Sequence, residues 1–334
     1  MITIILNMNL LKFFVPESLR ELLIKFKSKK HSGNKKYNLE DFQIYPKGAN
    51  LNSSLEKYFD SSLKKNFNLK KKDKIISLGT CFAEEIATLF KTMDKNYRIY
   101  EKNSQFYSAN WGRIYTLNNL LEILNYSFSK KKIIVEKNHK GYFDPLREQD
   151  CGFFLSHEQA VESISKHRNY SKSAFLNSDL IVLTIGQNES WFDIKYKITW
   201  GATPPPNIIK KNTKRFIYKC PSILENQKAL FKILNKIRKI NHKTKIIITL
   251  SPVPSHATFL KKNVILQSFI NKCNLRYSIE KILNQKKFKN ISYFPSFEIA
   301  LCNNLNTFQF DNRHVRSKVV ENILRIFKRT IKLI

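Results

Sequence analysis

The sequence predicts an α/β fold of three layers, in which helices cover both faces of a doubly wound, mostly parallel sheet. Three segments of strand length are apolar almost throughout: KIISLG at 74–79, DLIVLTIG at 179–186 and KIIITLSPV at 245–253. Such runs are typical of strands that are buried on both faces. Segments with helical periodicity separate them, and this alternation indicates a parallel sheet between two layers of helices.

The predicted helices follow from apolar residues spaced three or four positions apart. The first lies at 81–93, directly after the first strand, and a fourth strand is expected around 291–295. Further helices are predicted at 117–128, 156–170, 222–240, 262–284 and 315–330. The segment 196–215 contains three consecutive prolines and is expected to be an extended loop, which at this length usually serves a function.

The N-terminal part of the sequence differs from the rest. We expect a basic segment at 1–44, with Met8 as an alternative start to Met1, followed by a single domain at 45–330. A short amphipathic helix at 17–27 could lie on a membrane surface or pack on its own domain. Its apolar face would consist of Leu19, Leu22, Leu23 and Phe26. The polar stretch KSKKHSGNKKYN that follows is typical of a linker.

The formal net charge is +33 on 334 residues, which would suit nucleic acid or an anionic surface as a partner. The same composition, rich in Lys, Ile and Phe with only 8 Gly, is typical of an AT-rich genome. Basic residues are scattered along the whole chain, and no nucleic-acid-binding motif accompanies them. We therefore expect no specific nucleic-acid partner, and only a weak peripheral contact with an anionic membrane surface.

The cysteines and histidines give no sign of disulfides or metal. Five cysteines without a CxxC pair argue against a disulfide framework and a cysteine zinc site. The histidines show no metal-ligand spacing, and no apolar run reaches the length of a membrane span. We expect a reduced, cytoplasmic protein that uses no metal and no cofactor.

Polar residues follow three of the predicted strands, at the sheet edge where doubly wound folds bind their ligands. The first strand ends in Gly79-Thr80-Cys81, the second runs into GQNE at 186–189 and the third into SPVPSH at 251–256. A thiol at a helix N-terminus lies at the positive end of the helix dipole, which favours the nucleophilic thiolate. A preceding glycine lets the chain turn sharply.

Near the C-terminus, Asp311 and His314 are spaced i, i+3 in FDNRHV. At that spacing a carboxylate can hydrogen-bond the imidazole, fix its tautomer and stabilise the imidazolium that forms during proton transfer. An early nucleophile, an Asn-bearing loop and a late Asp-x-x-His together form a set suited to acyl transfer.

The motif IISLGTCFAEEIA at 75–87 resembles the signature of the GSCFA family, which is distantly related to the SGNH hydrolases. Further segments follow in that family's order, and the resemblance covers about 45–330. They are NWGRIYTLNNLLEIL (110–124), YFDPLR (142–147), GFFLS (152–156), LTIGQNESWFD (183–193), TLSPVPSHATF (249–259), YFPSFEI (293–299) and FDNRHV (310–315). The resemblance implies an SGNH-hydrolase-like, flavodoxin-like fold.

The SGNH pattern implies roles for individual residues. Aligning its Gly-Asp-Ser block on Gly79 puts Cys81 at the nucleophile position. Gly112 and Asn188 match the oxyanion-hole donors. Asp311 and His314 match the last block in full. The sequence departs from the GSCFA signature at Thr80, where that family has Ser. Cys81 is favoured as the nucleophile, Thr80 remains an alternative, and binding without covalent catalysis is a third possibility.

Glu189, His256 and Arg313 are further candidates for substrate binding. Glu189 could be a second acid or the ion-pair partner of Arg113 or Arg313, and His256 could line the pocket. Trp191 is expected to pack rather than to stack on substrate. The resemblance implies an ester hydrolase or O-acyltransferase that acts on an acylated carbohydrate or a related metabolite. The alternative is a non-catalytic module that binds an anionic glycan or a membrane surface.

Overall fold

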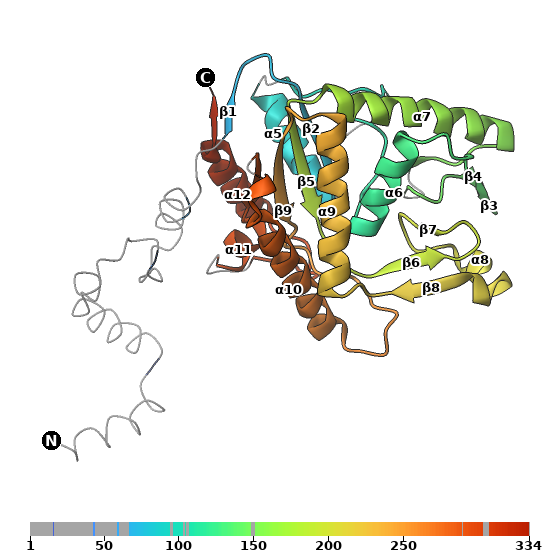
Figure 1. The fold of residues 1–334 in the computed structure, drawn as a ribbon. Coiled ribbons are helices and arrows are strands. Elements are labelled where there is room, and N and C mark those ends of the chain that lie inside the picture. Colours follow the sequence, from blue (N-terminus) through green and yellow to red (C-terminus); the bar gives the residue numbers. More distant parts are fainter. Residues whose placement is uncertain are drawn as a thin grey trace. The chain divides into compact units, whose positions relative to one another are not determined.

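The structure, a computed structural model, describes residues 16, 43, 59, 67–93, 96–102, 104, 107–147, 151–288, 290–302 and 307–333 (Figure 1). The expected helix at 17–27 lies outside these residues, and the boundary expected between 44 and 45 stays a prediction. No helix within the described part is long and apolar enough to cross a membrane.

A parallel sheet of four strands forms the centre of the fold, in the order β10-β9-β5-β2 (Figure 1). Its strands are β2 (Ile75–Gly79), β5 (Leu180–Ile185), β9 (Lys245–Leu250) and β10 (Ile291–Phe294). Every residue of β2 and β5 is buried, as expected for strands covered on both faces. The four predicted strands are therefore confirmed.

The order in which strands are added to the sheet changes direction at β2. After β2 it returns on the outer side of that strand, where Tyr97 forms a parallel bridge with Ile75. It then crosses to the other side, where β5 pairs with β2 in the register Ile75↔Leu180. This is the doubly wound topology predicted from the sequence, and its switch point lies between the carboxyl ends of β2 and β5.

Helices cover both faces of the sheet. On one face, α9 (Ile223–Ile240) lies between α6 (Leu117–Ser127) and α10 (Val264–Leu283), with α7 (His157–Asn177) beside them (Figure 1). On the other face lie α5 (Cys81–Thr92) and α12 (Ser317–Thr330), and α11 (Ser296–Leu301) follows β10. The Ser77 hydroxyl points to the α5 side and donates to the Ala83 carbonyl, whereas its neighbours Ile76 and Leu78 pack in the core beneath α6 and α9. These layers confirm the predicted α/β/α architecture.

Local sequence signals explain where several helices begin. Ser222 and Glu225 form a reciprocal capping box at the start of α9. The Asn263 side chain accepts hydrogen bonds from two backbone N–H groups at the start of α10. Helix α7 runs beyond the predicted end at 170, because Phe175 extends its buried face and packs on Trp111 with 5.6 Å between ring centroids.

The prediction of an extended loop at 196–215 is wrong. The segment contains β7 (Ile198–Thr199), α8 (Pro206–Lys211) and a 3-10 turn (Thr213–Arg215). Strand β7 joins an antiparallel sheet with β6 (Ser190–Asp193) and β8 (Phe216–Lys219). Buried Asp193 organises this region, because it accepts hydrogen bonds from the Arg215 guanidinium and from the Trp200 indole N–H.

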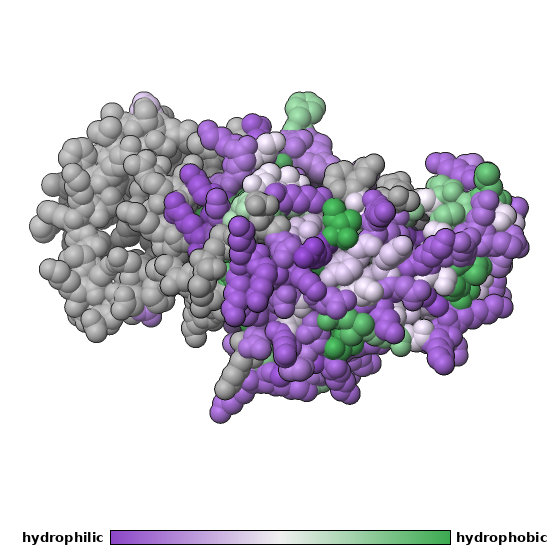
Figure 2. All heavy atoms as spheres, turned by 90° about the horizontal axis from the view of Figure 1, so that it is seen from above, coloured by the Kyte–Doolittle hydropathy of each residue, from purple (hydrophilic) through white to green (hydrophobic). Residues whose placement is uncertain are grey.

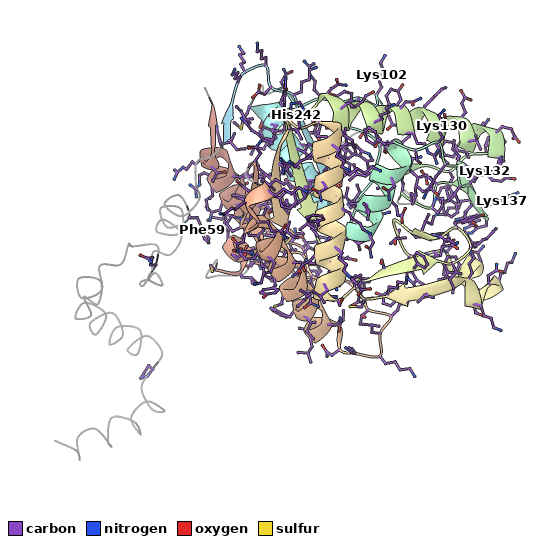
Figure 3. All side chains as sticks on the ribbon, in the orientation of Figure 1. Phe59, Lys102, Lys130, Lys132, Lys137 and His242 are labelled. Carbon is purple, nitrogen blue, oxygen red and sulfur yellow. The ribbon has the colours of Figure 1, made fainter. Side chains whose placement is uncertain are left out.

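Two more strand pairs complete the described part. Strands β3 (Glu136–Asn138) and β4 (Gly141–Phe143) form a hairpin, and β1 (Phe67–Leu69) pairs in parallel with β11 (Ile331–Leu333). The surface seen in Figure 2 is mostly hydrophilic, with hydrophobic residues in separate small patches. Exposed lysines project outward, among them Lys102, Lys130, Lys132 and Lys137 (Figure 3).

Candidate active site

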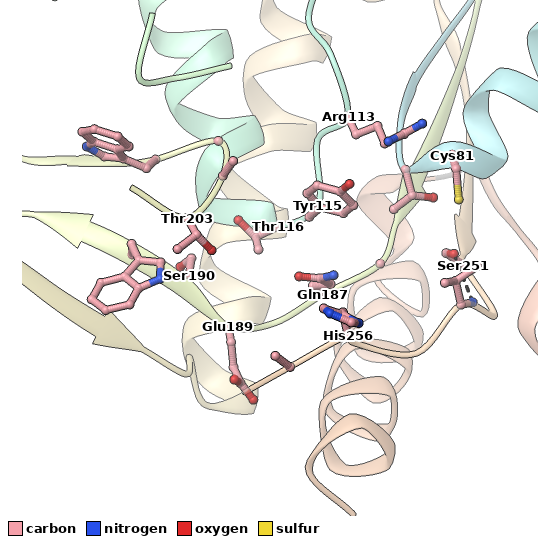
Figure 4. Close-up of a pocket in the computed structure, with 18 of the residues that line it drawn as sticks. Cys81, Arg113, Tyr115, Thr116, Gln187, Glu189, Ser190, Thr203, Ser251 and His256 are labelled. Carbon is pink, nitrogen blue, oxygen red and sulfur yellow. Dashed lines mark hydrogen bonds between the residues drawn. The ribbon is translucent and has the colours of Figure 1, made fainter. Parts of the chain in front are cut away.

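A cavity of about 520 Å³ opens at the carboxyl ends of β2, β5 and β9, beside the switch point of the sheet (Figure 4). Six of the residues predicted for the site line it: Thr80, Cys81, Glu189, His256, Arg313 and His314. Cys81 lies toward one end of the drawn cavity and Glu189 toward the other (Figure 4). The N-terminal and C-terminal motifs, distant in the chain, therefore meet at one cavity.

The turn between β2 and α5 separates the two candidate nucleophiles. Gly79 has φ +132°, and a Cβ there would lie 2.0 Å from the Thr184 carbonyl oxygen, so only glycine fits this turn. The buried Thr80 side chain faces the sheet, where its hydroxyl lies 3.0 Å from the Thr184 hydroxyl. Cys81 is the first residue of α5 and is partly exposed at the cavity.

Cys81 is not poised as a thiolate. Burial raises the pKa of its thiol, and the charge of Glu84 raises it further, against the lowering effects of Arg113 and the Phe82 N–H. The position at a helix N-terminus does favour the thiolate, but desolvation and the nearby carboxylate outweigh it. The resting form near neutral pH is therefore the thiol, which needs a base to become a nucleophile.

Glu84 is itself held in place by two donors. It accepts a hydrogen bond from the Arg113 Nε at 3.0 Å and from the Tyr107 hydroxyl at 2.7 Å. Arg113, which lines the cavity, therefore pairs with Glu84 and not with Glu189 as the sequence had suggested.

Asp311 and His314 form the predicted pair at the cavity rim. The Asp311 carboxylate accepts the Nδ1–H of His314, and also the backbone N–H groups of His314 (2.9 Å) and Arg313 (3.0 Å). These backbone N–H groups, followed by the imidazole, lower the pKa of Asp311 to about 2. The carboxylate therefore stays ionised above about pH 3 and holds His314 in the tautomer whose Nε2 is basic.

The predicted oxyanion donors do not reach the cavity. The Asn188 Nδ2 donates to the Pro221 carbonyl at 2.8 Å, and its Oδ1 accepts from Asn226 at 2.8 Å. Asn188 is buried and anchors the start of α9, which corrects its predicted role. Gly112 is not among the lining residues either, although its neighbour Arg113 is.

Glu189 connects three parts of the fold through hydrogen bonds to its carboxylate. Its carboxylate accepts hydrogen bonds from the Tyr218 hydroxyl, the Thr258 hydroxyl (2.6 Å) and the Asn271 amide (2.8 Å). These donors come from β8, the loop after β9 and α10. Among the described residues Glu189 forms no ion pair with Arg113 or Arg313. It does line the cavity, so its part in substrate binding stays a prediction.

Three aromatic rings form a wall of the cavity near Glu189. Trp191 lies 5.0 Å from Tyr218 and 5.0 Å from Phe259 between ring centroids, and all three line the cavity. Trp191 thus packs on its neighbours, as expected, and also lines the cavity. Its indole N–H is buried and has no hydrogen-bond partner among the described residues.

Two residues with a place at the site were missed in the sequence. Gln187 lines the cavity instead of its neighbour Asn188. Lys272 is buried beside Gly186 and Ser251, two residues of the cavity lining. It belongs to the buried face of α10, together with Leu275 and Ile279. A lysine on an apolar stripe was the signal that could have drawn attention to it. Within the described ranges, no group of three or more His, Cys, Asp or Glu side chains could hold a metal ion.

Comparisons with known proteins find distant structural likenesses. A crystal structure of an acetyl esterase mutant with acetate ion is 10% identical, with a TM-score of 0.35 over 77% of this chain and 98% of that one. A carbohydrate esterase family 3 structure from Talaromyces cellulolyticus is 12% identical, with a TM-score of 0.32 over 76% and 94%.

A salicylyl-acyltransferase, SsfX3, from a tetracycline biosynthetic pathway is 13% identical, with a TM-score of 0.28 over 48% of this chain. This chain spans 40% of the length of that acyltransferase. No curated protein matches. At these scores the activity has to be argued from the chain's own residues.

The family comparison is specific. Residues 74–327 match the sequence model of the GSCFA family. The match covers well over half of the chain and includes both the Cys81 turn and the Asp311–His314 pair. The chain belongs to the GSCFA family.

Proposed function

We propose that this protein is an ester hydrolase or O-acyltransferase that works through a covalent thioester on Cys81. The observation that carries the proposal is that the Cys81 thiol and the Asp311-bound His314 imidazole line one cavity at the switch point of the sheet. A nucleophile, a base and a group that orients the base are the parts that acyl transfer requires.

The raised pKa of Cys81 decides how the first step proceeds. The His314 Nε2 takes the thiol proton as the sulfur attacks the ester carbonyl carbon. The Arg113 guanidinium and the Gln187 amide, which line the same cavity, supply donors for the oxyanion of the tetrahedral intermediate. The alcohol then leaves with the proton that His314 returns, and an acyl thioester remains on Cys81.

The second step releases the acyl group. Water or an acceptor hydroxyl gives its proton to His314 and attacks the thioester carbonyl. The acid or the new ester leaves, and the sulfur recovers its proton from the imidazolium. Which acceptor takes the acyl group distinguishes a hydrolase from an acyltransferase.

The lining of the cavity supports an acylated carbohydrate as the substrate. The aromatic wall of Trp191, Tyr218 and Phe259 offers apolar surface to the C–H face of a sugar ring. The polar side chains of Gln187 and Thr203 offer hydrogen bonds to hydroxyl groups. A mixed aromatic and polar lining of this kind suits a ring with many hydroxyls.

The test combines ester turnover with trapping of the intermediate. Wild type, Cys81→Ala, Thr80→Ala and His314→Ala are assayed in parallel on p-nitrophenyl acetate and on acetylated sugars, with and without a sugar acceptor. Intact mass measurement then identifies the acylated protein, and peptide mapping identifies the acylated residue. We expect the adduct on Cys81 in wild type and its loss in Cys81→Ala.

The matched control is Cys273→Ala, because Cys273 is an exposed thiol of α10 that does not line the cavity. It should behave as wild type. If wild type turns over no ester and forms no adduct, or if Cys81→Ala and His314→Ala equal wild type, the proposal fails. A non-catalytic binding module then becomes the better account.

A further inference from the structure

A second cavity, of about 330 Å³, lies beside the candidate active site. Its lining comes from the loop after β9, the first turns of α10, helix α11 and the loop before α12. The surface that it presents is mostly apolar, and its volume falls within the range of about 300 to 1,000 Å³ that is typical of small-molecule sites. The larger apolar side chains in the lining are Val264, Ile265, Phe269, Phe297, Leu301 and Phe308.

Several of these side chains are left open to solvent. Ile265 is 65% exposed, Phe269 is 55% exposed and Leu301 is 46% exposed, although all three line the same concave surface. Apolar side chains that gather around a hollow in this way mark a place where an apolar group binds. The shape and chemistry of the cavity therefore suit a hydrocarbon group.

The charged groups of the lining already have partners within the chain. The Asp311 carboxylate accepts the His314 imidazole N–H and two backbone N–H groups. The Lys272 Nζ donates to the Gly186 carbonyl at 2.6 Å and to the Ser251 carbonyl at 2.7 Å. With these groups engaged, apolar contact is the main interaction that the cavity offers to a ligand.

The two cavities meet at His256 and Arg313, which line both of them. Side chains that are held weakly stand at this boundary. His256 is exposed, and the Arg313 guanidinium donates one long hydrogen bond, 3.5 Å, to the Pro254 carbonyl. None of the ion pairs among the described residues includes Arg313.

The proposed catalytic pair also spans the boundary, because Asp311 lines the second cavity and His314 lines the first. A carbonyl group within reach of His314 therefore lies in a cavity that adjoins the apolar one. A chain attached to that carbonyl has an apolar place to extend into, past His256 and Arg313.

We propose that the second cavity binds the acyl chain of the ester substrate, so that the acyl group is an apolar chain longer than acetyl. The role in substrate selection rests on the proposed function. The binding of an apolar chain does not, because a free carboxylic acid can be used to measure it without any turnover.

The first measurement is the binding of acetate, butyrate, hexanoate and octanoate by isothermal titration calorimetry. Burial of each added CH₂ should tighten binding about threefold, so octanoate should bind about 50-fold or more tightly than butyrate. Octanoate that binds no more tightly than butyrate overturns the proposal.

Helix α10 offers matched pairs of variants. Ile265 and Phe269 line the cavity, whereas their neighbours Leu266 and Ile270 do not line it and are similarly exposed, at 66% and 48%. The double variant Ile265→Ser/Phe269→Ser should weaken octanoate binding about tenfold or more, because it removes apolar contact surface. The control, Leu266→Ser/Ile270→Ser, should stay within about twofold of wild type.

Equal losses in the two double variants overturn the proposal, because they would mean that the exposed face of α10 as a whole, and not the cavity, takes up the chain. Circular dichroism melting checks that both variants fold. Leu301→Ser, which alters the lining from α11, gives the same comparison if the α10 variant does not fold.

The second measurement is kcat/KM on p-nitrophenyl acetate, butyrate, hexanoate and octanoate. We expect kcat/KM of wild type to rise about threefold with each added CH₂, and the series to flatten in Ile265→Ser/Phe269→Ser. Turnover without dependence on chain length overturns the proposal and leaves the proposed function in place. Selective octanoate binding in a protein that turns over no ester leaves the cavity in its role and removes the proposed function.

Discussion

The Thr80 hydroxyl lies 3.0 Å from the Thr184 hydroxyl, so the side chain of Thr80 is turned into the sheet while its neighbour Cys81 lines the cavity. Both residues line the cavity, but Thr80 is buried with its hydroxyl next to that of Thr184, whereas Cys81 is partly exposed. The Thr80 backbone N–H also donates to the Thr184 hydroxyl, at 2.7 Å, which fixes Thr80 as part of the turn.

From this arrangement we expect the two positions to respond differently to substitution. Cys81→Ala should lower kcat/KM for an activated ester by about 1,000-fold or more, because it removes the attacking atom. Thr80→Ser keeps the hydroxyl and should stay within about tenfold of wild type. Steady-state kinetics on p-nitrophenyl acetate measures both. A Cys81→Ala variant that keeps the kcat/KM of wild type would contradict the assignment.

Gly186→Ala should destabilise the protein by about 1 to 3 kcal/mol, because its methyl group would overlap the Thr80 Cγ2. Adding Thr80→Ser removes that methyl and should restore much of the loss. Gly79→Ala is the contrasting variant, since its Cβ would meet the Thr184 carbonyl oxygen, which no side-chain change relieves. Urea unfolding of the single and double variants gives the coupling energy, and strict additivity would contradict this packing.

Asp311→Asn should lower kcat by about 100-fold or more with little change in KM, because His314 loses the carboxylate that orients it. The lowered pKa of Asp311 means that the carboxylate stays ionised in the folded protein until the pH falls to about 2. Any loss of wild-type activity between pH 4 and 6 therefore arises from another group. A pH–rate profile compared with the matched variant Asp311→Glu tests this.

Lys272 makes the stability of the protein depend on pH. Its pKa is about 7 in the folded protein and ordinarily 10.5, so from pH 7 to 10 the unfolded chain binds the proton that the folded protein has released. Below pH 7 the folded protein bears the full free-energy cost of burying the charged ammonium, and this cost decreases as the pH rises. Wild type should therefore gain about 1.4 kcal/mol per pH unit relative to Lys272→Met over this range. Urea unfolding at several pH values measures the difference, and parallel curves would show that Lys272 is not buried as an ammonium.

Trp191→Ala should raise KM for acetylated sugars about tenfold while leaving KM for ethyl acetate unchanged, because only the sugar reaches the aromatic wall. Trp191→Phe keeps a ring and should give an intermediate value. Equal effects on both esters would point to a disturbed cavity instead of a sugar subsite.

The features that the sequence predicted well are local ones. The strands at 180–185 and 245–250 are continuous apolar runs, and the Asp311–His314 pair is made within a single turn. The features that could not be predicted are side-chain positions that depend on partners distant in the chain. Asn188 was assigned to the oxyanion hole, yet Pro221 and Asn226, which no pattern connects with it, turn its amide away.

The segment 196–215 illustrates the same limit. Its prolines indicate a loop, but buried Asp193 binds Arg215, which also pairs with Glu136 from a separate hairpin. Contacts between elements so far apart override the local preference of the segment. Glu189 and Lys272 are further examples, since their positions depend on donors and carbonyls from three different elements.

Cys81 follows the first strand of the central sheet, and His314 lies just before the last long helix. The proposed nucleophile and its proposed base are therefore supplied by distant parts of the chain. During synthesis Cys81 is made long before His314, so an incomplete chain carries the thiol without the imidazole. If the proposed roles hold, reactivity arises only when the chain has been completed and folded, and a protein truncated before residue 310 would keep its four central strands but lack the base for its nucleophile.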